Sequence, residues 1–317
     1  MKSMIELTTI SKQYEDQYAL KDLSLTINDG ELFVLVGPSG SGKTTLLKTI
    51  NRLVVPTMGT VKIDGEDVAQ VDLQQLRRRI GYVLQTGALF PNMTVAQNAS
   101  VQLDNLGWPT EKKQQRISEL LEQVGLAPDL FLNRMPSELS GGEAQRVGIV
   151  RALAARPKLV LMDEPFSALD PVSRRQLQQI VIDLHHNIDT TIVFVTHDMH
   201  EAVRLADRVA VVYHGELQQV GTPAQLLSSP ATPFVKTFFA DEQAGNRLLG
   251  QVVAKGFGCT PSATDQPVTL QPDQTIYAWA ALLQERPTQT ILVNGQLLTN
   301  QDLLRYMASL GTGGDRD

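Results

Sequence analysis

The chain has 317 residues, 42% of them hydrophobic, and a formal net charge of −6, which is typical of a soluble globular protein with one large or two smaller domains. The acidic balance argues against a broad nucleic-acid-binding surface. The single cysteine, Cys259, allows no internal disulfide. No run of about 18 apolar residues is present to span a membrane. We therefore expect a protein of a reducing compartment, without a signal peptide, that serves any membrane process from the cytoplasmic side.

Two β-strands, over residues 4–10 and 23–27, are predicted at the start of the chain from alternation and β-branched content. A continuously apolar strand over 32–36 then leads into a glycine-rich segment, after which a helix ends near Leu53. The segment reads Gly37-Pro38-Ser39-Gly40-Ser41-Gly42-Lys43-Thr44, and it has the GxxxxGK[ST] spacing of a phosphate-binding loop.

In such a loop the glycines let several backbone N–H groups, and the positive end of the following helix, point at phosphate groups. Lys43 would reach the outer phosphates, and the hydroxyl of Thr44 would ligate Mg²⁺. The alternative is a chance match in a glycine-rich turn. The strand before the segment and the helix after it argue for a nucleotide site.

The middle of the chain begins with short elements. Residues 61–65 suggest a hairpin, and the three arginines at 77–79 favour a solvated face. An apolar strand over 80–84 ends at Gln85. Beyond it, residues from about 86 to 157 are expected to form a mainly helical insertion with breaks at glycine and proline.

Three continuous apolar runs follow, as expected for strands of a parallel sheet that is buried on both faces. Helical segments separate them. The fold class predicted for residues 1–240 is therefore α/β, with helices flanking a mostly parallel sheet. The three runs are 159–162, 191–195 and 208–212.

Composition changes after about residue 240. Residues 241–265 are predicted to be a linker, and 311–317 a disordered tail. Between them, residues 266–310 predict a strand, a helix, a second strand, a turn at Asn294-Gly295 and a second helix. This pattern indicates a small α/β module of its own.

Two carboxylates, Asp163 and Glu164, follow the apolar run 159–162 directly. Behind a phosphate-binding loop, the first such carboxylate holds Mg²⁺ and the second can orient and deprotonate a water molecule. The alternative is a strand that merely ends in an acidic turn.

A second helix start with unusual chemistry lies at Ser140. With Glu143 three residues later, this serine fits a capping box, and a well-capped helix is the plainer interpretation. Gly141 and Gly142 would also let a ligand approach the helix N-terminus closely. One chain would then carry two helix N-termini that face anions, and a dimer could place them on either side of one nucleotide.

Three further residues are candidates by position alone. Gln85 and His197 each follow an apolar strand, and strand ends of this kind are where ligands bind. Tyr14 could stack on an adenine ring, although an ordinary half-buried aromatic residue is as good an interpretation. The remaining histidines show no pattern and are expected at the surface: His185, His186, His200 and His214.

Together these residues resemble the ATP-binding subunit of an ABC transporter, over residues 4 to about 240, which implies an ABC-type P-loop fold that binds ATP. One departure is Glu143, where glutamine is usual, and we expect its carboxylate to turn back to its own helix cap. The resemblance is carried by Walker A (37–44), the Q-loop (Gln85), the signature motif (139–143), Walker B (161–164), the D-loop (167–170), the switch histidine (His197) and the adenine-stacking position (Tyr14).

The resemblance implies that two chains bind two ATP molecules head to tail. Glu164 would be the general base, His197 would contact the γ-phosphate, and Gln85 would complete the catalytic set. The implied Mg²⁺ ligands are Thr44, Gln85 and Asp163. The implied nucleotide contacts are Tyr14, Gly37, Pro38, Ser39, Gly40, Ser41, Gly42, Lys43, Thr44, Thr45, Ser140, Gly141, Gly142 and Asp170, of which Ser140 and Gly142 would act on the partner chain's nucleotide.

A finer resemblance, to importers of quaternary amines such as glycine betaine, carnitine and choline, is carried by residues 50–53, 89–95, 107–108 and 162–171. It implies integral membrane permease subunits docked near the Q-loop, an extracellular substrate-binding protein or domain, and a peripheral location on the cytoplasmic face of the cell membrane. Residues 266–310 resemble one CBS module, which could bind a regulatory small ligand or sense ionic strength, or could serve only dimerisation or packing.

Two alternative functions remain open. The chain could energise an importer of another solute, such as an amino acid, because this subunit discriminates solutes poorly. It could also be a soluble ABC-type ATPase of DNA repair or translation. Such proteins usually carry long coiled coils or two ATPase halves, whereas this chain has one half and an acidic charge, so no nucleic-acid partner is expected.

Overall fold

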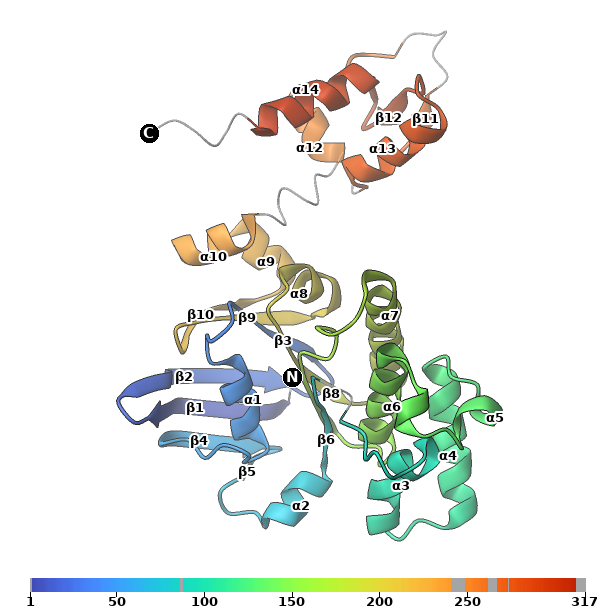
Figure 1. The fold of residues 1–317 in the computed structure, drawn as a ribbon. Coiled ribbons are helices and arrows are strands. Elements are labelled where there is room, and N and C mark those ends of the chain that lie inside the picture. The colour runs from blue at the N-terminus through green and yellow to red at the C-terminus, as the bar shows by residue number, and fades with distance from the viewer. Residues whose placement is uncertain (1, 86–87, 241–248, 262–266, 273, 312–317) are drawn as a thin grey trace. The chain divides into compact units, whose positions relative to one another are not determined.

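The chain forms two compact units, Met1–Phe238 and Phe239–Asp317, in the computed structural model shown in Figure 1. Each unit has a hydrophobic cluster of its own. All residues expected to bind nucleotide belong to the first unit. The structure describes residues 2–85, 88–240, 249–261, 267–272 and 274–311.

The centre of the first unit is a six-stranded sheet in the order β10-β9-β3-β8-β7-β6, parallel except for β10. Every residue of β3, β7 and β8 is buried, as their continuous apolar runs predict, and the α/β fold class is confirmed. The strands are β3 (Leu32–Val36), β6 (Ile80–Val83), β7 (Leu159–Asp163), β8 (Thr191–Thr196), β9 (Arg208–Tyr213) and β10 (Glu216–Gly221).

A second, antiparallel sheet has the order β2-β1-β4-β5. Its first two strands are longer than the alternation of side chains predicts, because register shifts after Leu7 and Ile10 interrupt that alternation. Thr9 and Asp22 have positive φ angles of 49° and 47° in this irregular part of the ladder. The strands are β1 (Ser3–Tyr14), β2 (Gln17–Asn28), β4 (Met58–Ile63) and β5 (Glu66–Asp67).

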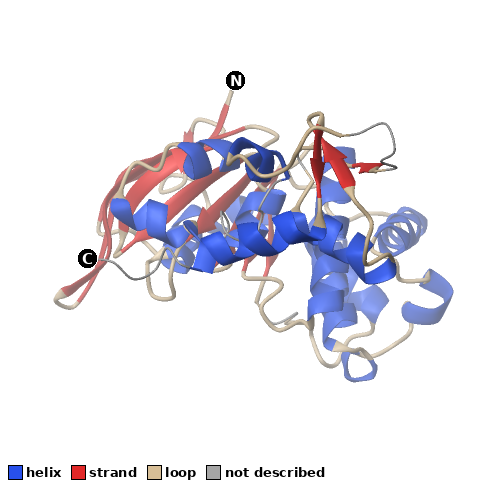
Figure 2. Cartoon of the chain, turned by 90° about the horizontal axis from the view of Figure 1, so that it is seen from above, coloured by secondary structure: helices blue, strands red, loops and turns tan. Residues whose placement is uncertain are grey.

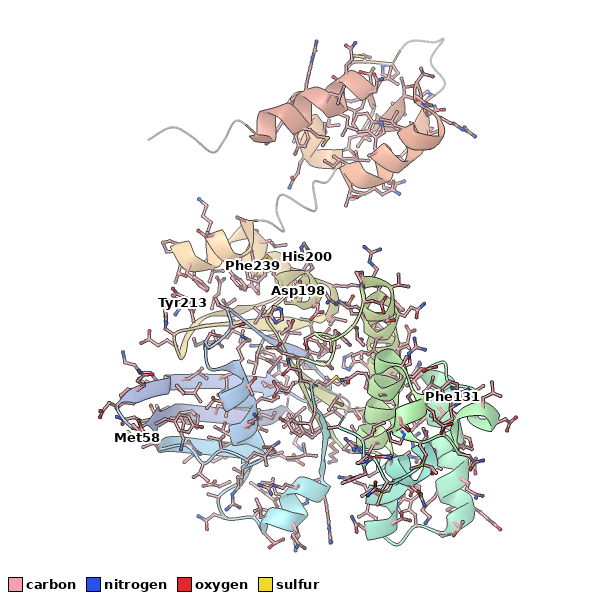
Figure 3. The ribbon with its side chains drawn as sticks, in the orientation of Figure 1. Met58, Phe131, Asp198, His200, Tyr213 and Phe239 are labelled. Atoms are coloured by element: carbon pink, nitrogen blue, oxygen red, sulfur yellow. The ribbon has the colours of Figure 1, made fainter. Side chains whose placement is uncertain are left out.

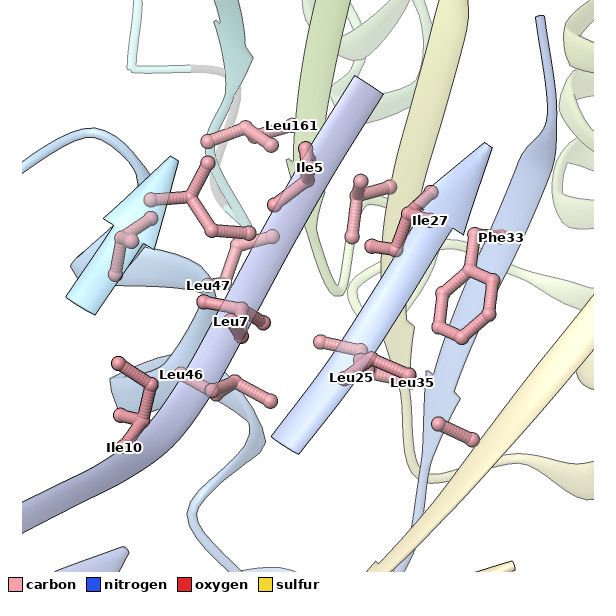
Figure 4. Packing of buried hydrophobic residues seen from close by; sticks show 14 of the residues in the cluster. Ile5, Leu7, Ile10, Leu25, Ile27, Phe33, Leu35, Leu46, Leu47 and Leu161 are labelled. Carbon is pink, nitrogen blue, oxygen red and sulfur yellow. The ribbon is translucent and has the colours of Figure 1, made fainter. Parts of the chain in front are cut away.

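One hydrophobic cluster joins the two sheets through α1 (Lys43–Ile50), the helix that follows the glycine-rich loop. Figure 4 shows Leu46 and Leu47 of α1 among side chains of β1, β2 and β3. Both leucines are fully buried, and burial of each such side chain stabilises the fold by about 1.5–3 kcal/mol. This packing fixes the start of α1, and with it the loop between β3 and the helix. The other labelled side chains are Ile5, Leu7, Ile10, Leu25, Ile27, Phe33, Leu35 and Leu161.

Between β6 and β7 the described residues form helices and loops. Figure 1 shows these helices on the side of β6 away from β1 and β2, and Figure 2 gives the view from above with helices in blue and strands in red. Residues 86 and 87, at the start of the expected insertion, lie outside the described residues. The last helix packs against two earlier ones and against β6, so it joins the insertion to the central sheet. The helices are α3 (Val95–Asn105), α4 (Thr110–Gln123), α5 (Pro128–Phe131), the 3₁₀ turn Pro136–Glu138 and α6 (Gly141–Leu153).

A short helix, α2 (Leu73–Arg78), precedes β6 and carries part of the arginine run expected on a solvated face. The three arginines are exposed, but Arg77 is not only solvated. Its guanidinium donates to the carbonyl of Arg52 at 3.0 Å and to that of Asn51 at 3.3 Å. The side chain thereby ties α2 to the end of α1.

The rest of the first unit consists of helices around the last strands. Figure 3 shows Tyr213 at the end of β9, where its ring stacks on Phe234 with centroids 4.0 Å apart. His185, expected at the surface, is instead half-buried, and its Nε2 lies 3.4 Å from a carboxylate oxygen of Asp207. The helices are α7 (Pro171–Asn187), α8 (Met199–Leu205), α9 (Pro223–Ser228) and α10 (Pro233–Phe238).

The second unit has its own three-stranded sheet, in which β12 pairs parallel with β11 and antiparallel with β13. Fully buried Trp279 belongs to its core cluster, together with Leu249 and Val252 of a helix that falls inside the expected linker 241–265. The elements are α12 (Leu249–Ala254), β11 (Val268–Thr269), α13 (Ile276–Glu285), β12 (Ile291–Val293), β13 (Gln296–Leu298) and α14 (Asn300–Gly311).

The other parts of the expected linker and tail are only partly described. Residues 241–248 and 262–266 of the linker, and 312–317 of the tail, lie outside the described residues. The order strand, helix, strand, strand, helix over 268–311 agrees with the pattern read from the sequence, with one short strand added. The likeness of this unit to a CBS module stays a prediction.

Candidate functional site

The glycine-rich loop has a backbone that only glycine can adopt at two positions. A Cβ atom on Gly37 would lie 2.1 Å from the carbonyl oxygen of Val212, and one on Gly42 would lie 2.4 Å from that of Ala19. Gly42 also has a φ of 101°, which side chains rarely allow. The close approach of β9 and β2 to this loop thus fixes its curved backbone conformation. A curved loop of this kind can direct its N–H groups at a phosphate group.

Lys43 lies in the interior of this loop and is almost completely buried. Its ammonium group donates to the carbonyl oxygens of Gly37 and Pro38, both at 2.8 Å. Burial lowers the pKa of Lys43, and the nearby carboxylates of Glu164 and Asp163 oppose that shift. The sequence motif therefore places a desolvated cation where the outer phosphates of a nucleotide are expected.

Thr44, at the start of α1, meets Asp163, at the end of β7. The threonine hydroxyl donates to a carboxylate oxygen of Asp163 at 2.7 Å. A hydroxyl and a carboxylate side by side are the oxygen ligands that Mg²⁺ prefers, so the two side chains fit the ion expected here. Within the described chain, no cluster of three or more His, Cys, Asp or Glu could hold a metal, so such an ion would depend on ligands from the nucleotide and water.

Glu164 and His197 form the next pair. Glu164 directly follows β7, has a positive φ of 45° and donates its backbone N–H to the carbonyl of Val195. Its carboxylate oxygen lies 3.1 Å from Nδ1 of His197. A left-handed conformation costs a non-glycine residue about 1–2 kcal/mol, and strain of this kind collects at functional positions. The pair joins the ends of two neighbouring strands, β7 and β8.

Gln85 reaches this pair through Ser167, the first residue of the D-loop stretch 167–170, to which the sequence assigned no contact of its own. Its side-chain amide donates to the hydroxyl of Ser167 at 3.2 Å, and that hydroxyl donates to the backbone carbonyl of Glu164 at 3.0 Å. Ser167 lies three residues after Glu164, so its D-loop position placed it near the site, but its hydrogen bonds could not be predicted from the sequence. The contact joins the end of β6 to the turn after β7.

Thr196 and Glu201 are two further residues that sequence reasoning missed. The hydroxyl of Thr196 donates to the buried carboxylate of Glu201 at 2.6 Å and accepts from the backbone N–H of Asp198 at 3.0 Å. These bonds brace the turn that holds His197. A cavity of about 40 Å³, large enough for a water molecule, lies beside Glu164 and His197.

The signature segment is a regular helix N-terminus. The backbone N–H of Ser140 donates to the carboxylate of Glu143 at 2.7 Å, and the N–H of Glu143 donates to the Ser140 hydroxyl at 3.3 Å. These bonds hold the pKa of Glu143 below its usual range, with help from the charges of Arg134 and Arg146. The carboxylate therefore turns back to its own helix, as expected from the capping-box spacing.

Gly141 and Gly142 are not required by the chain around them. A Cβ atom on Gly141 would meet nothing within 4 Å, and one on Gly142 would come no closer than 3.6 Å to Ser173. Neither glycine has a left-handed φ. No hydrogen bond or ion pair of the described residues links 140–142 to the phosphate-binding loop.

The last two candidates have local partners. Asp170 caps α7 by accepting from the N–H groups of Val172 and Ser173 at 3.0 Å. Hydrogen bonding to the side chain of Ser173, and then to these N–H groups, lowers the pKa of Asp170. Tyr14, at the end of β1, is half exposed, and the ammonium of Lys12 lies 4.8 Å from its ring centroid. Contact of either residue with a nucleotide stays a prediction.

Known proteins resemble both the sequence and the fold. A profile of the ABC transporter family matches residues 20–167. The chain is 44% identical to the glycine betaine/carnitine/choline transport ATP-binding protein OpuCA of Bacillus subtilis (strain 168), over 92% of this chain and 75% of that protein. It is 42% identical to the osmoprotectant import ATP-binding protein OsmV of Salmonella typhimurium, over 84% of this chain and 69% of that protein.

A solved structure extends the likeness to three dimensions. The dimeric structure of a post-hydrolysis state of the ATP-binding cassette MJ0796, bound to ADP and Pi, is 35% identical with a TM-score of 0.63, and the match covers 69% of this chain and 99% of that chain. In the part of this chain that the structure describes, no helix has the length and apolar character of a membrane span. Sequence identity, fold and the arrangement of Lys43, Asp163 and Glu164 agree, and the chain therefore belongs to the ABC transporter family, as one of its ATP-binding, ATP-hydrolysing subunits.

Proposed function

We propose that this ATPase energises an importer of quaternary amine osmolytes such as glycine betaine, carnitine or choline. The observation that carries the proposal is 44% identity over 92% of the chain to a transport protein named for these solutes. A second relative is named for osmoprotectant import. The amine itself would not contact this chain, since the residues described above are suited to phosphate groups rather than to a quaternary ammonium ion.

In the proposed site Lys43 and the loop N–H groups bind the phosphates, and Thr44, Gln85 and Asp163 hold Mg²⁺, which would neutralise phosphate charge as hydrolysis proceeds. Glu164 takes the proton of the attacking water. His197 holds the γ-phosphate and keeps the Glu164 carboxylate oriented, which the 3.1 Å contact supports.

The second half of the site comes from a second copy of the chain. Supporting this, a Cβ atom on Gly141 would meet no described atom within 4 Å, and one on Gly142 would make only an ordinary contact with Ser173, so both glycines leave room at a helix N-terminus. Ser140 and the two glycines would approach the nucleotide bound to the partner chain. A solved relative with this fold is a dimer.

Permease subunits would dock at a groove of about 460 Å³ beside β6. Its lining includes Leu84, next to Gln85, and the half-exposed side chains of Leu53 and Phe90. Apolar side chains of this exposure suit an amphipathic helix of a membrane subunit. The chain would thus lie at the cytoplasmic face of the cell membrane, and an extracellular substrate-binding protein or domain would select the solute.

The test is co-purification of this chain with membrane and substrate-binding subunits, followed by titration of the substrate-binding partner with solutes. Binding of glycine betaine, carnitine or choline supports the proposal, whereas binding of an amino acid alone would favour the alternative function, an importer of amino acids. Leu53→Asp with Phe90→Asp should abolish co-purification while ATP binding stays. Leu304→Asp, an equally apolar exposed position in the second unit, is the matched control.

The second unit would adjust the ATPase in response to a small ligand or to ionic strength. Its own hydrophobic cluster supports an independent module. Removal of residues 245–317 should leave ATP hydrolysis intact and change its dependence on salt. An identical salt profile would make this unit a passive packing module.

A further inference from the structure

A second cavity, of about 450 Å³, lies in the first unit at the opposite edge of the central sheet from the nucleotide residues. Its lining includes Ile80 and Leu159, the first residues of the parallel strands β6 and β7. The nucleotide candidates Gln85 and Asp163 lie at the other ends of the same strands. A cavity of this volume is within the range that holds small organic molecules.

The floor of this cavity is apolar and is built from residues of several strands and one helix, together with residues of the adjoining turns. Met4 of β1, Leu76 of α2 and Leu159 of β7 line it, and each is almost fully buried. Ile63 of β4 and Val71 add half-buried apolar surface. Because the packing of several elements fixes these side chains, the hollow is a permanent feature of the fold.

The rim of the cavity is cationic although the whole chain is acidic. Two of its four basic residues have partners, since Arg79 lies 2.9 Å from Glu66 and Lys158 lies 3.7 Å from Asp64. Arg78 and Arg156 also line the cavity, and their side chains form no hydrogen bond or ion pair with any described residue. Two guanidinium groups thus face an apolar hollow without a counter-ion from the described chain.

We propose that this cavity binds a small amphipathic anion, whose apolar body covers the floor and whose carboxylate or phosphate pairs with Arg78 and Arg156. Guanidinium groups suit both anions, because their planar N–H donors match two oxygen atoms at once. The volume is too small for a two-chain membrane lipid, so the ligand is a free molecule with one short chain or ring system. The cavity shares no lining residue with the nucleotide residues, and the proposal does not depend on the transported solute.

Such a ligand would regulate the ATPase. Three elements connect this cavity with nucleotide candidates. Strand β6 begins at the cavity and leads to Gln85, and strand β7 begins there and ends at Asp163. Helix α6 begins after Ser140 and ends two residues before Ala155, which lines the cavity. An occupant would therefore favour one spacing of these elements. By linkage, a ligand that changes nucleotide affinity has its own affinity changed by the same factor.

The test is calorimetric titration of the full chain with sodium decanoate, with saturating ADP present so that the phosphate-binding loop is occupied. One decanoate should bind per chain, and acetate, which lacks the apolar body, should not. Decyltrimethylammonium, with the same body and the opposite charge, should bind at least about tenfold more weakly. The decanoate-loaded chain should also bind ADP with an altered dissociation constant.

Arginine variants assign the binding to this cavity. Arg78→Gln and Arg156→Gln should each weaken decanoate binding about threefold, and the double variant about tenfold, because exposed ion pairs contribute modestly. Arg286→Gln, an exposed arginine of the second unit, should leave decanoate binding unchanged. These positions lie on the surface, so all variants should fold.

Several results would overturn the proposal. Equal binding of decanoate and decyltrimethylammonium would show a non-specific apolar surface. Unchanged binding by the double arginine variant would place the ligand elsewhere. Binding to vesicles of anionic phospholipid without binding of free decanoate would replace a small ligand by a membrane surface. An unaltered ADP affinity would remove the regulatory role.

Discussion

Two helix N-termini of this protein carry glycine pairs, and the glycines are there for opposite reasons. Before α1, Gly37 and Gly42 are required by the chain itself, because a Cβ atom would lie 2.1 Å and 2.4 Å from backbone oxygens. At the start of α6, Gly141 and Gly142 have room for a side chain and an ordinary backbone. Both helices present free N–H groups, which suit an anion.

This contrast separates glycines that the fold requires from glycines that the fold would allow to be replaced. Glycine inside a helix costs up to about 1 kcal/mol of stability relative to alanine, and no close contact or backbone angle in the chain requires glycine at 141 or 142. The first helix N-terminus is thus shaped by its own chain, whereas in the site proposed above the second would serve a nucleotide held by another chain. Five variants, in four experiments, test that division, in order of decreasing expected effect.

The largest effect is expected from Glu164→Gln. Loss of a general base lowers the rate of ATP hydrolysis by about 10²–10⁴-fold, while the phosphate-binding loop still holds ATP. Single-turnover hydrolysis and nucleotide binding should be measured together. Retained turnover would remove Glu164 as the base. Glu143→Gln, the same substitution at the N-terminus of α6, is the matched control.

Ser140→Arg should separate the two halves of the site. On the Glu164→Gln background it should raise the dissociation constant of the ATP-bound dimer by about 100-fold, because a large cation replaces a small hydroxyl at a close contact. Light scattering with ATP gives the dimer population. ATP binding by the monomer should be unchanged, and a dimer as stable as the parent's would contradict a site shared between chains.

A pair of alanine variants tests the glycines directly. Gly42→Ala should lower the free energy of unfolding by about 2–4 kcal/mol, through the clash with Ala19 and a strained φ. Gly142→Ala should leave it unchanged or raise it by up to about 1 kcal/mol, yet weaken the ATP-bound dimer. Urea unfolding gives the first quantity and light scattering the second. Equal destabilisation by both variants would contradict the contrast between the glycines before α1 and those at the start of α6.

The smallest effect is expected from Glu143→Gln. The glutamine keeps the capping bond, so only the attraction of a negative charge to the helix N-terminus is lost, about 0.3–1 kcal/mol at pH 7. Because the folded pKa of Glu143 is lowered, this stabilisation is complete above its usual value of 4.5 and disappears as the pH falls through the lowered pKa. Urea unfolding of the parent and of Glu143→Gln should show a smaller difference in their free energies of unfolding near pH 4 than at pH 7.

Much of the fold could be predicted because its strands are continuous apolar runs. Leu32–Val36, Leu159–Asp163 and Thr191–Thr196 are wholly buried, so their composition alone marks them. The full lengths of β1 and β2 could not be predicted, since bulges near Thr9 break the alternation on which the prediction rests. Strand β13 is three residues long, which is too short for a periodic signal.

The candidate site divides in the same way. Lys43, Asp163 and Glu164 follow motifs with a fixed spacing from a strand or a helix, so the sequence places them near one another. The hydrogen bond from Ser167 to the carbonyl of Glu164, and the one that Glu201 accepts from Thr196, leave no pattern in the sequence, so these contacts could not be predicted. The helix Leu249–Ala254 was missed because it is short and polar residues precede it, and its place depends on tertiary contacts such as the core cluster that contains Trp279.

The open space at Gly141 and Gly142 has a consequence for protein engineering. A designer who optimised this chain in isolation would replace both glycines by alanine, because the helix would gain up to about 1 kcal/mol at each position and nothing in the chain would clash. Under the proposed two-chain site, the product would be a more stable protein that had lost the surface through which it approaches its partner's nucleotide. Stability of the single chain is therefore a misleading target for thermostabilising this enzyme, and the assembled dimer with ATP is the state to optimise.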